Sequence, residues 1–182
     1  SFAEPGAKDT AGTAVARGTL ADNQLVDVKV IYRQQPKVAG GNHFGSRLVS
    51  DRSAQLFVAL GGRLVDSQRG FAQDKTRDNG KVMRITTDGA PSAGNPFPAM
   101  SGTHQDSIWS YGHRNPQGAA LHPASGELWV SEHGPQGGDE INRVMPGANY
   151  GWPIISYGQE YGTTTQVGEG TASGEGRWSP SE

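Results

Sequence analysis

The sequence predicts an all-β protein, and three observations support that prediction. The 182 residues include 27 glycines and 11 prolines, and the apolar residues are gathered into short runs. This composition is typical of short strands joined by many turns. No stretch of ten or more residues combines apolar residues at helical spacing with clean caps. One order of strands and turns also occurs twice along the chain.

The individual strands are expected where short apolar runs are bounded by turn residues. Residues 1–23 are mixed and polar without a clear period, so no element is expected there. Residues 24–34 alternate, with Val26, Val28 and Val30 on one face and charged residues on the other, which predicts a strand. Further strands are expected at 46–51, 55–60, 80–89, 107–112, 118–123, 127–132 and 140–147.

The repeated order of elements predicts a β-propeller. Residues 45–89 and 117–147 both read as a strand, a tight turn, an apolar strand, a long polar loop and a last strand. Leu56 and Leu128 hold the same place in the two units. A blade cannot bury both of its faces alone, and neighbouring blades in a ring cover them. The chain has room for about three blades, so residues 1–182 are expected to form a single partial propeller domain, truncated at both ends.

The charge and composition exclude several classes of protein. The 16 basic and 18 acidic residues give a net charge of −2, which argues against the basic face that nucleic acid requires. No apolar run is long enough to span a membrane. The absence of cysteine excludes a disulfide framework and a thiolate metal site.

The first loop that could carry chemistry contains His43 between Asn42 and Phe44, with glycines on both sides. A neutral histidine accepts a proton near pH 7, and the glycines allow the backbone to turn the imidazole toward a cavity. In the alternative interpretation, His43 caps a strand turn.

The second loop, "YGHRNPQG", contains Arg114 and Asn115. The guanidinium of an arginine is a rigid fork of donors that suits carboxylates, and the asparagine adds a donor and an acceptor. Alternatively, Arg114 folds onto Tyr111 or Trp109 at the surface.

The third loop, "SEHGPQGGDEIN", contains Asp139 and Glu140 beside a glycine-rich turn. Calcium prefers oxygen ligands from carboxylates and backbone carbonyls, although the spacing of an EF-hand is missing. A solvated acidic turn is the alternative. The histidines lack HxxxH and HExxH spacing, which argues against a zinc site. The aromatic residues of "GANYGWP" are expected mainly to pack.

Four segments in this order, "GNHFGSRLV", "YGHRNPQG", "SEHGPQGGDEIN" and "NYGWP", closely resemble the soluble PQQ-dependent glucose/sorbosone dehydrogenase family. The match is nearest to the aldose sugar dehydrogenase branch and runs from about residue 28 to 161. The resemblance implies a six-bladed β-propeller that binds pyrroloquinoline quinone (PQQ) with Ca²⁺ and oxidises the C1 hydroxyl of aldoses to lactones.

The resemblance also assigns roles to residues around the cofactor. It implies that His43 is the general base, which takes the proton of the C1 hydroxyl while hydride passes to PQQ. It places Arg114 and Asn115 in contact with the cofactor and Tyr161 near it. An arginine at the quinone oxygens is chemically sensible because the reduced quinone gains negative charge there, so Arg114 is also expected to assist catalysis.

Two calcium sites are implied by the same resemblance. The backbone carbonyls of Gly134 and Pro135 match the ligands of the cofactor's Ca²⁺, which acts as a Lewis acid. Glu140 and the carbonyl of Tyr150 match a second, structural Ca²⁺ site.

The resemblance implies an aldose substrate and an artificial or respiratory electron acceptor as partners. It also implies a periplasmic or secreted location, and it leaves a homodimer open. Asn42 replaces an acidic residue of the glucose-oxidising branch, and Gly61 and Gly62 stand where that branch has an Asp. Both differences favour a broader range of aldoses.

Further cofactor contacts in the family come from C-terminal blades outside this chain, so the segment alone is expected to bind PQQ weakly or not at all. Two alternatives to the dehydrogenase are a Ca²⁺-dependent lactonase-type propeller and a non-catalytic sugar-binding propeller.

Overall fold

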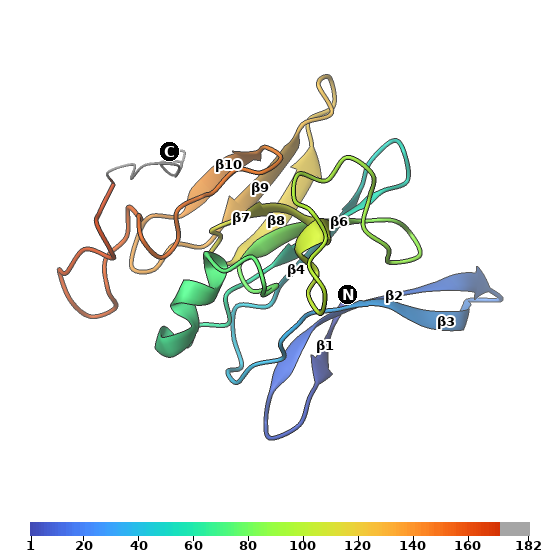
Figure 1. Ribbon diagram of the computed structural model, residues 1–182, viewed down its shortest axis with the longest axis horizontal. Coiled ribbons are helices and arrows are strands. Elements are labelled where there is room, and N and C mark those ends of the chain that lie inside the picture. Colours follow the sequence, from blue (N-terminus) through green and yellow to red (C-terminus); the bar gives the residue numbers. More distant parts are fainter. Residues whose placement is uncertain (172–182) are drawn as a thin grey trace.

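The computed structural model describes residues 1–171, and these form three antiparallel sheets (Figure 1). The strands are β1 (Phe2–Pro5), β2 (Ala11–Ala21), β3 (Gln24–Arg33), β4 (Gly45–Ser50), β5 (Leu56–Leu60), β6 (Lys81–Ile85), β7 (Ile108–Tyr111), β8 (Pro116–Leu121), β9 (Leu128–Glu132) and β10 (Glu140–Val144). Within this part of the chain the only helices are two 3-10 turns, η1 (Asp66–Ala72) and η2 (Gln105–Ser107). The all-β prediction is therefore confirmed.

Each sheet is built from strands that follow one another in sequence. The orders are β1-β2-β3, β4-β5-β6-β7 and β10-β9-β8, which is the simple up-and-down pattern of propeller blades. No helix of residues 1–171 has the length and apolar character needed to cross a membrane.

The middle sheet lies between the other two, and alternate residues of its strands serve two different cores. On β5, Val58 joins a core with Val15 of the first sheet, while Phe57 joins a core with Val130 of the third. Successive side chains of a strand point to opposite faces, so one apolar strand supplies both interfaces. This stacking is how blades bury faces that a single sheet leaves open.

The repeat predicted from the sequence is confirmed by the pairing of the strands. Leu56 pairs with Ile85 across β5 and β6, and Leu128 pairs with Val144 across β9 and β10. The register also shows where the two sheets differ. Lys81 opens β6 opposite Leu60, whereas β10 opens with Glu140, opposite Glu132.

The expectation that residues 1–23 contain no element is wrong, because β1 and β2 occupy most of this segment. Gly12, Thr13, Ala14 and Val15 are buried in succession. A strand covered on both faces has no alternation of apolar and polar residues, and its small side chains gave no apolar run.

The strand predicted at 24–34 is present as β3, but its apolar face is not covered. Figure 1 shows the hairpin of β2 and β3 extending away from the other two sheets. Val26 and Val28 are 37% and 56% exposed. Asp27 has a φ of +51°, and the pairing of β2 with β3 shifts between Arg17 and Thr19, so regular alternation fails there.

Candidate functional site

The loops that carry the predicted catalytic residues meet at one end of the middle and third sheets. The amide N–H of Gly62, which follows β5, donates to the carbonyl of Arg114 at 2.8 Å. The amide N–H of Gly45, two residues after His43, donates to Oδ1 of Asn115 at 3.3 Å. The structure therefore brings His43, Arg114 and Asn115 together from two loops far apart in sequence.

Gly61 sets how closely these loops approach. A Cβ on Gly61 would lie 2.2 Å from the carbonyl oxygen of His43 and 2.9 Å from Oδ1 of Asn115. Both distances are far too short for non-bonded atoms, so only glycine fits between the two loops in this arrangement.

Arg63 holds the loop that presents His43. This arginine is fully buried, and its Nε donates to the carbonyl of Asn42 at 3.0 Å. Its guanidinium also donates to the carbonyls of Ala11 and Gly40 and lies 3.4 Å from the ring centroid of Phe44. A long charged side chain at the centre of a loop thus fixes the backbone on either side of His43. Sequence reasoning missed it, because Arg63 stands in a segment that resembles an ordinary polar loop.

The environment of His43 keeps its imidazole neutral. Burial, followed by repulsion from Arg114, His133 and Arg63, lowers the pKa of His43 to about 4. At pH 7 the ring therefore has a free nitrogen lone pair that can accept a proton. His43 also has a φ of +53°, an uncommon backbone conformation for a residue with a side chain.

The imidazole of His43 lines a small cavity together with Gly62, Leu64, Val65, Arg69 and Trp152. Its volume is about 10 Å³, whereas small-molecule pockets usually measure about 300–1,000 Å³. The described residues thus place the candidate base at a recess and do not by themselves enclose a substrate.

Arg114 is buried and turned toward the third sheet. One terminal nitrogen, Nη1, donates to the carbonyls of His133 and Gly134, and Nη2 donates to the hydroxyl of Tyr161 at 3.0 Å. The alternative in which this arginine folds onto Tyr111 or Trp109 is wrong. The rings beside its guanidinium are those of Trp152, at 5.3 Å, and Tyr161, at 5.8 Å.

The buried Nε of Arg114 has no hydrogen-bond partner within residues 1–171. An unsatisfied buried donor on a charged group costs free energy. The arginine therefore fits a ligand that brings an anionic or quinone oxygen to this point.

Arg69 and Glu160 form an ion pair at the edge of the His43 cavity, and neither residue stands in one of the motifs that the sequence offers. Arg69 of η1 makes two hydrogen bonds with the carboxylate of Glu160, and its guanidinium lies 5.6 Å from the ring of Trp152. Trp152 therefore has Arg69 and Arg114 as neighbours. Of the aromatic pair in "NYGWP", Tyr150 packs in the core, as expected, while Trp152 borders the candidate site.

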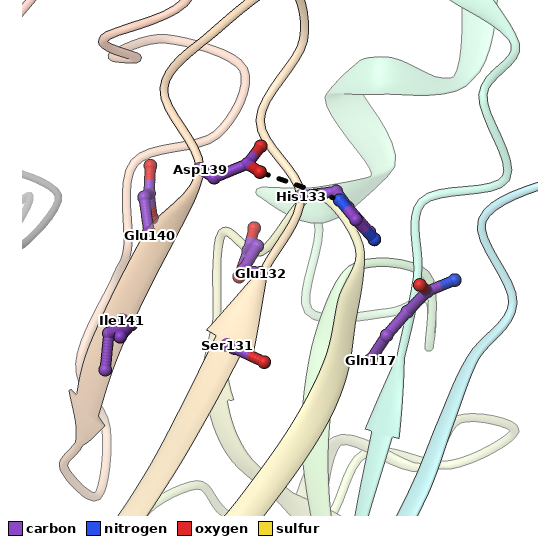
Figure 2. A pocket seen from close by; sticks show the side chains of 7 residues that line it. All are labelled: Gln117, Ser131, Glu132, His133, Asp139, Glu140 and Ile141. Carbon is purple, nitrogen blue, oxygen red and sulfur yellow. Dashed lines mark ion pairs between the residues drawn. The ribbon is translucent and has the colours of Figure 1, made fainter.

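The acidic loop lies beside a larger cavity of about 450 Å³, over the ends of β8, β9 and β10 (Figure 2). Asp139 is exposed; its Oδ1 accepts from the N–H of Gly134 at 2.9 Å, and its Oδ2 lies 3.9 Å from His133. Glu140 faces Glu132 on the neighbouring strand. Burial, and the charge of Glu132, raise the pKa of Glu140. The alternative interpretation, a solvated acidic turn, thus suits Asp139 and not Glu140.

Tyr150 and Glu140 belong to the same neighbourhood. The ring of Tyr150 stacks on His113 with centroids 4.6 Å apart, and His113 hydrogen-bonds Glu132 at 2.8 Å. Glu132 is the cross-strand partner of Glu140. A carboxylate held beside a second one favours a nearby cation, and a structural Ca²⁺ held by Glu140 and the carbonyl of Tyr150 stays a prediction.

The expected ligands of the cofactor's calcium are less accessible. The carbonyl oxygen of Gly134 accepts from Arg114, so a cation there must share that oxygen with the guanidinium. Pro135 is buried beside it. Within the described part of the chain, no three His, Cys, Asp or Glu side chains gather in a way that could hold a metal ion. One predicted ligand set consists of the carbonyls of Gly134 and Pro135, and the other combines the carboxylate of Glu140 with the carbonyl of Tyr150.

These features define a β-propeller protein whose polar site lies where the loops of adjacent blades meet. The model of the Glucose / Sorbosone dehydrogenase family matches residues 1–181. The chain belongs to this family.

Relatives in sequence include two enzymes. Aldose sugar dehydrogenase YliI of Escherichia coli K12 is 48% identical over 163 residues, which cover 88% of this chain and 43% of the relative. Quinoprotein glucose dehydrogenase B of Acinetobacter calcoaceticus is 46% identical over 77 residues, covering 42% of this chain and 15% of the relative. The chain thus spans less than half the length of these relatives.

Solved structures agree with the fold. The apo-form of the soluble aldose sugar dehydrogenase from E. coli superposes with a TM-score of 0.89 at 44% identity, covering 98% of this chain and 51% of that one. The PQQ-bound aldose sugar dehydrogenase from Streptomyces coelicolor has a TM-score of 0.68 at 29% identity, covering 95% and 45%. The three sheets correspond to about half of such a propeller.

Proposed function

We propose that the protein oxidises the C1 hydroxyl of aldose sugars to lactones, with PQQ and Ca²⁺ as cofactors and a periplasmic or secreted location. The observation that carries this proposal is the juxtaposition of a neutral His43 with Arg114, whose buried Nε has no hydrogen-bond partner among residues 1–171. Residues 1–182 would form part of the propeller domain that holds the site.

His43 is the proposed general base. Its neutral imidazole takes the proton of the C1 hydroxyl as the C1–H bond breaks. Arg114 and His133 raise the local positive potential around the ring, which also favours the alkoxide character that develops on the sugar oxygen. The surrounding positive charge therefore stabilises the developing alkoxide, while it makes the ring of His43 a weaker base.

The cofactor would be held by Arg114, Asn115 and Tyr161. PQQ, when bound, supplies a two-electron acceptor for the hydride that leaves C1. Arg114 can direct its unpartnered Nε toward the cofactor, while Tyr161, at 58% exposure, presents its ring next to the guanidinium. Asn115 holds the His43 loop through Gly45 and so keeps the base next to the cofactor site.

Calcium would occupy two places. The carbonyls of Gly134 and Pro135 would hold the ion that accompanies the cofactor and acts there as a Lewis acid. Glu140 and the carbonyl of Tyr150 would hold a structural ion, which relieves the repulsion between Glu140 and Glu132.

The substrate range is proposed to be broad. Asn42, Gly61 and Gly62 carry no carboxylate, so these three positions supply no acidic group that would select one pattern of sugar hydroxyls.

The test uses the full-length gene product with PQQ, Ca²⁺, an aldose and an artificial dye, with His43→Ala as the comparison. We expect dye reduction by the wild type and a loss of about 10²- to 10⁴-fold in kcat for the variant, with PQQ affinity retained.

Three other results would overturn the proposal in different ways. Undiminished activity in the variant would remove His43 from the role of base. Lactone hydrolysis that needs Ca²⁺ and no PQQ would favour a lactonase. Sugar binding without dye reduction would indicate a non-catalytic propeller.

A further inference from the structure

A buried chain of side chains lies directly behind the loop that presents Arg114. Ser110 Oγ lies 2.8 Å from His113 Nε2, and His113 Nδ1 lies 2.8 Å from Glu132 Oε2. An ionised carboxylate only accepts, so Nδ1–H donates to Glu132 and Nε2 accepts from the serine hydroxyl. The stack of Tyr150 on the imidazole, with an interplanar angle of 18°, fixes the plane of the ring.

This connectivity is that of a hydrolase triad, but its burial excludes that chemistry. Ser110 and His113 are both 0% exposed, and Glu132 is 6% exposed. A nucleophile must reach the substrate, and no surface of the serine is open to one. The chain of hydrogen bonds therefore has another role.

The two oxygens of Glu132 hold two consecutive residues of the loop. Oε2 accepts from the ring of His113, and Oε1 accepts from the backbone N–H of Arg114. The carbonyl of Arg114 is held by Gly62. The backbone N–H and the backbone carbonyl of Arg114 are thus both held by hydrogen bonds, and the side chain extends from this fixed backbone to Tyr161.

We infer that Glu132 is a positioning residue, which aims Arg114 at the cofactor by fixing the backbone of residues 113 and 114. The inference rests on the proposed function, since it assigns the purpose of that geometry to cofactor binding. Hydrogen bonds to a buried carboxylate are stronger than neutral ones, and residues that orient a ligand-binding group commonly matter almost as much as the group itself.

The test compares Glu132→Ala, Glu132→Gln and Ser110→Ala in the full-length gene product. Each is measured for PQQ affinity at saturating Ca²⁺, for thermal stability, and for hydrogen exchange of the Arg114 amide. Ser110→Ala is the matched control, because it disturbs the same buried chain at the end that does not contact Arg114.

We expect Glu132→Ala to weaken PQQ binding by about 10- to 100-fold and to speed exchange of the Arg114 amide. Glu132→Gln retains an acceptor for that amide and can donate to His113 in its other tautomer, so it should restore affinity to within about tenfold of wild type. Ser110→Ala should lower stability and leave PQQ affinity unchanged.

Wild-type affinity in a folded Glu132→Ala variant would overturn the inference. So would a loss of affinity in Ser110→Ala equal to that in Glu132→Ala, since both would then act only through stability. If the wild type itself does not bind PQQ, the proposed function fails, and the exchange of the Arg114 amide still decides whether Glu132 fixes this backbone.

Discussion

Lys81 and Glu140 occupy the same place in two neighbouring sheets, and one is a basic residue while the other is acidic. Each opens the third strand of its repeat, opposite the last residue of the central strand. Lys81 is fully buried, and its Nζ donates to the carbonyls of Phe71, Ala72 and Asn79 at 2.9–3.0 Å. Burial lowers the pKa of Lys81 to about 7.

Glu140 differs from Lys81 in its cross-strand neighbour and in the kind of group that would stabilise it. Opposite Lys81 stands the apolar Leu60, whereas opposite Glu140 stands the carboxylate of Glu132. The loop of the middle sheet is thus folded around an ammonium group that the chain itself supplies. The loop of the third sheet presents acidic groups that favour an external cation. The middle sheet is therefore stabilised by its own lysine, and we propose that a bound cation has the corresponding role in the third sheet.

Removing the internal cation should have the largest effect. Lys81→Met leaves three carbonyls without their donor, and we expect the free energy of unfolding to fall by about 2–4 kcal/mol. Chemical denaturation measures this directly. Lys29→Met, on exposed β3, is the control and should change stability by less than about 0.5 kcal/mol. A Lys81→Met variant as stable as the wild type would contradict the claim that the buried lysine stabilises the loop of the middle sheet.

Replacing Glu140 should lower the free energy of unfolding only when calcium is present. At a Ca²⁺ concentration about 100 times its Kd, the ion should stabilise the wild type by about 2.7 kcal/mol. Glu140→Gln should lose most of this gain and, without calcium, be at least as stable as the wild type, because the neutral amide is not repelled by Glu132 and costs less to bury than a carboxylate.

Thermal unfolding with and without Ca²⁺ distinguishes these cases. Glu127→Gln removes an exposed carboxylate of the preceding turn, 45% exposed, and should respond to calcium as the wild type does. Equal stabilisation of Glu140→Gln would contradict the assignment of a cation to the third sheet.

The smallest effect concerns two histidines near the middle sheet. A hydrogen bond to Asp78 raises the pKa of His104 above 6.5, whereas burial and nearby cations lower that of His43 to about 4. His104 therefore contributes stability below pH 6.5 that is lost as the pH rises through its folded pKa. The unfolded chain protonates His43 more readily than the folded one does, so the free energy of unfolding falls as the pH decreases from 6.5 toward 4.

Both rings are partly exposed, so water screens these contributions to stability and keeps them small. NMR titration of the two rings separates the cases without a stability measurement. Titration of both near pH 6.5 would show that the surrounding charges do not act on them as described.

The sequence was most informative where apolar runs ended at glycine. The strands from 45 to 144 could be predicted for that reason, and the order of motifs brought His43, Arg114 and Asn115 into one hypothesis. β2 was missed because Thr13, Ala14 and their neighbours are small and buried on both faces.

Buried charges were harder to predict, because a charged residue in a sequence normally indicates the surface. Lys81 and Arg63 gave no other signal. Glu132 did give one: it lies two residues after Val130 and four after Leu128, on the face that β9 buries. Its partner Glu140 becomes visible only once the register of the two strands is known.

The close approach at Gly61 has a consequence for protein engineering. A designer who wished to narrow the sugar preference would be tempted to place an acidic side chain at this position. The first atom of that side chain would collide with the backbone of His43 and with Asn115. A single substitution would therefore displace the proposed base and its loop before the new side chain could contact the proposed substrate. A change of sugar selectivity at Gly61 therefore requires matching substitutions in the loop of His43 and in the loop of Asn115.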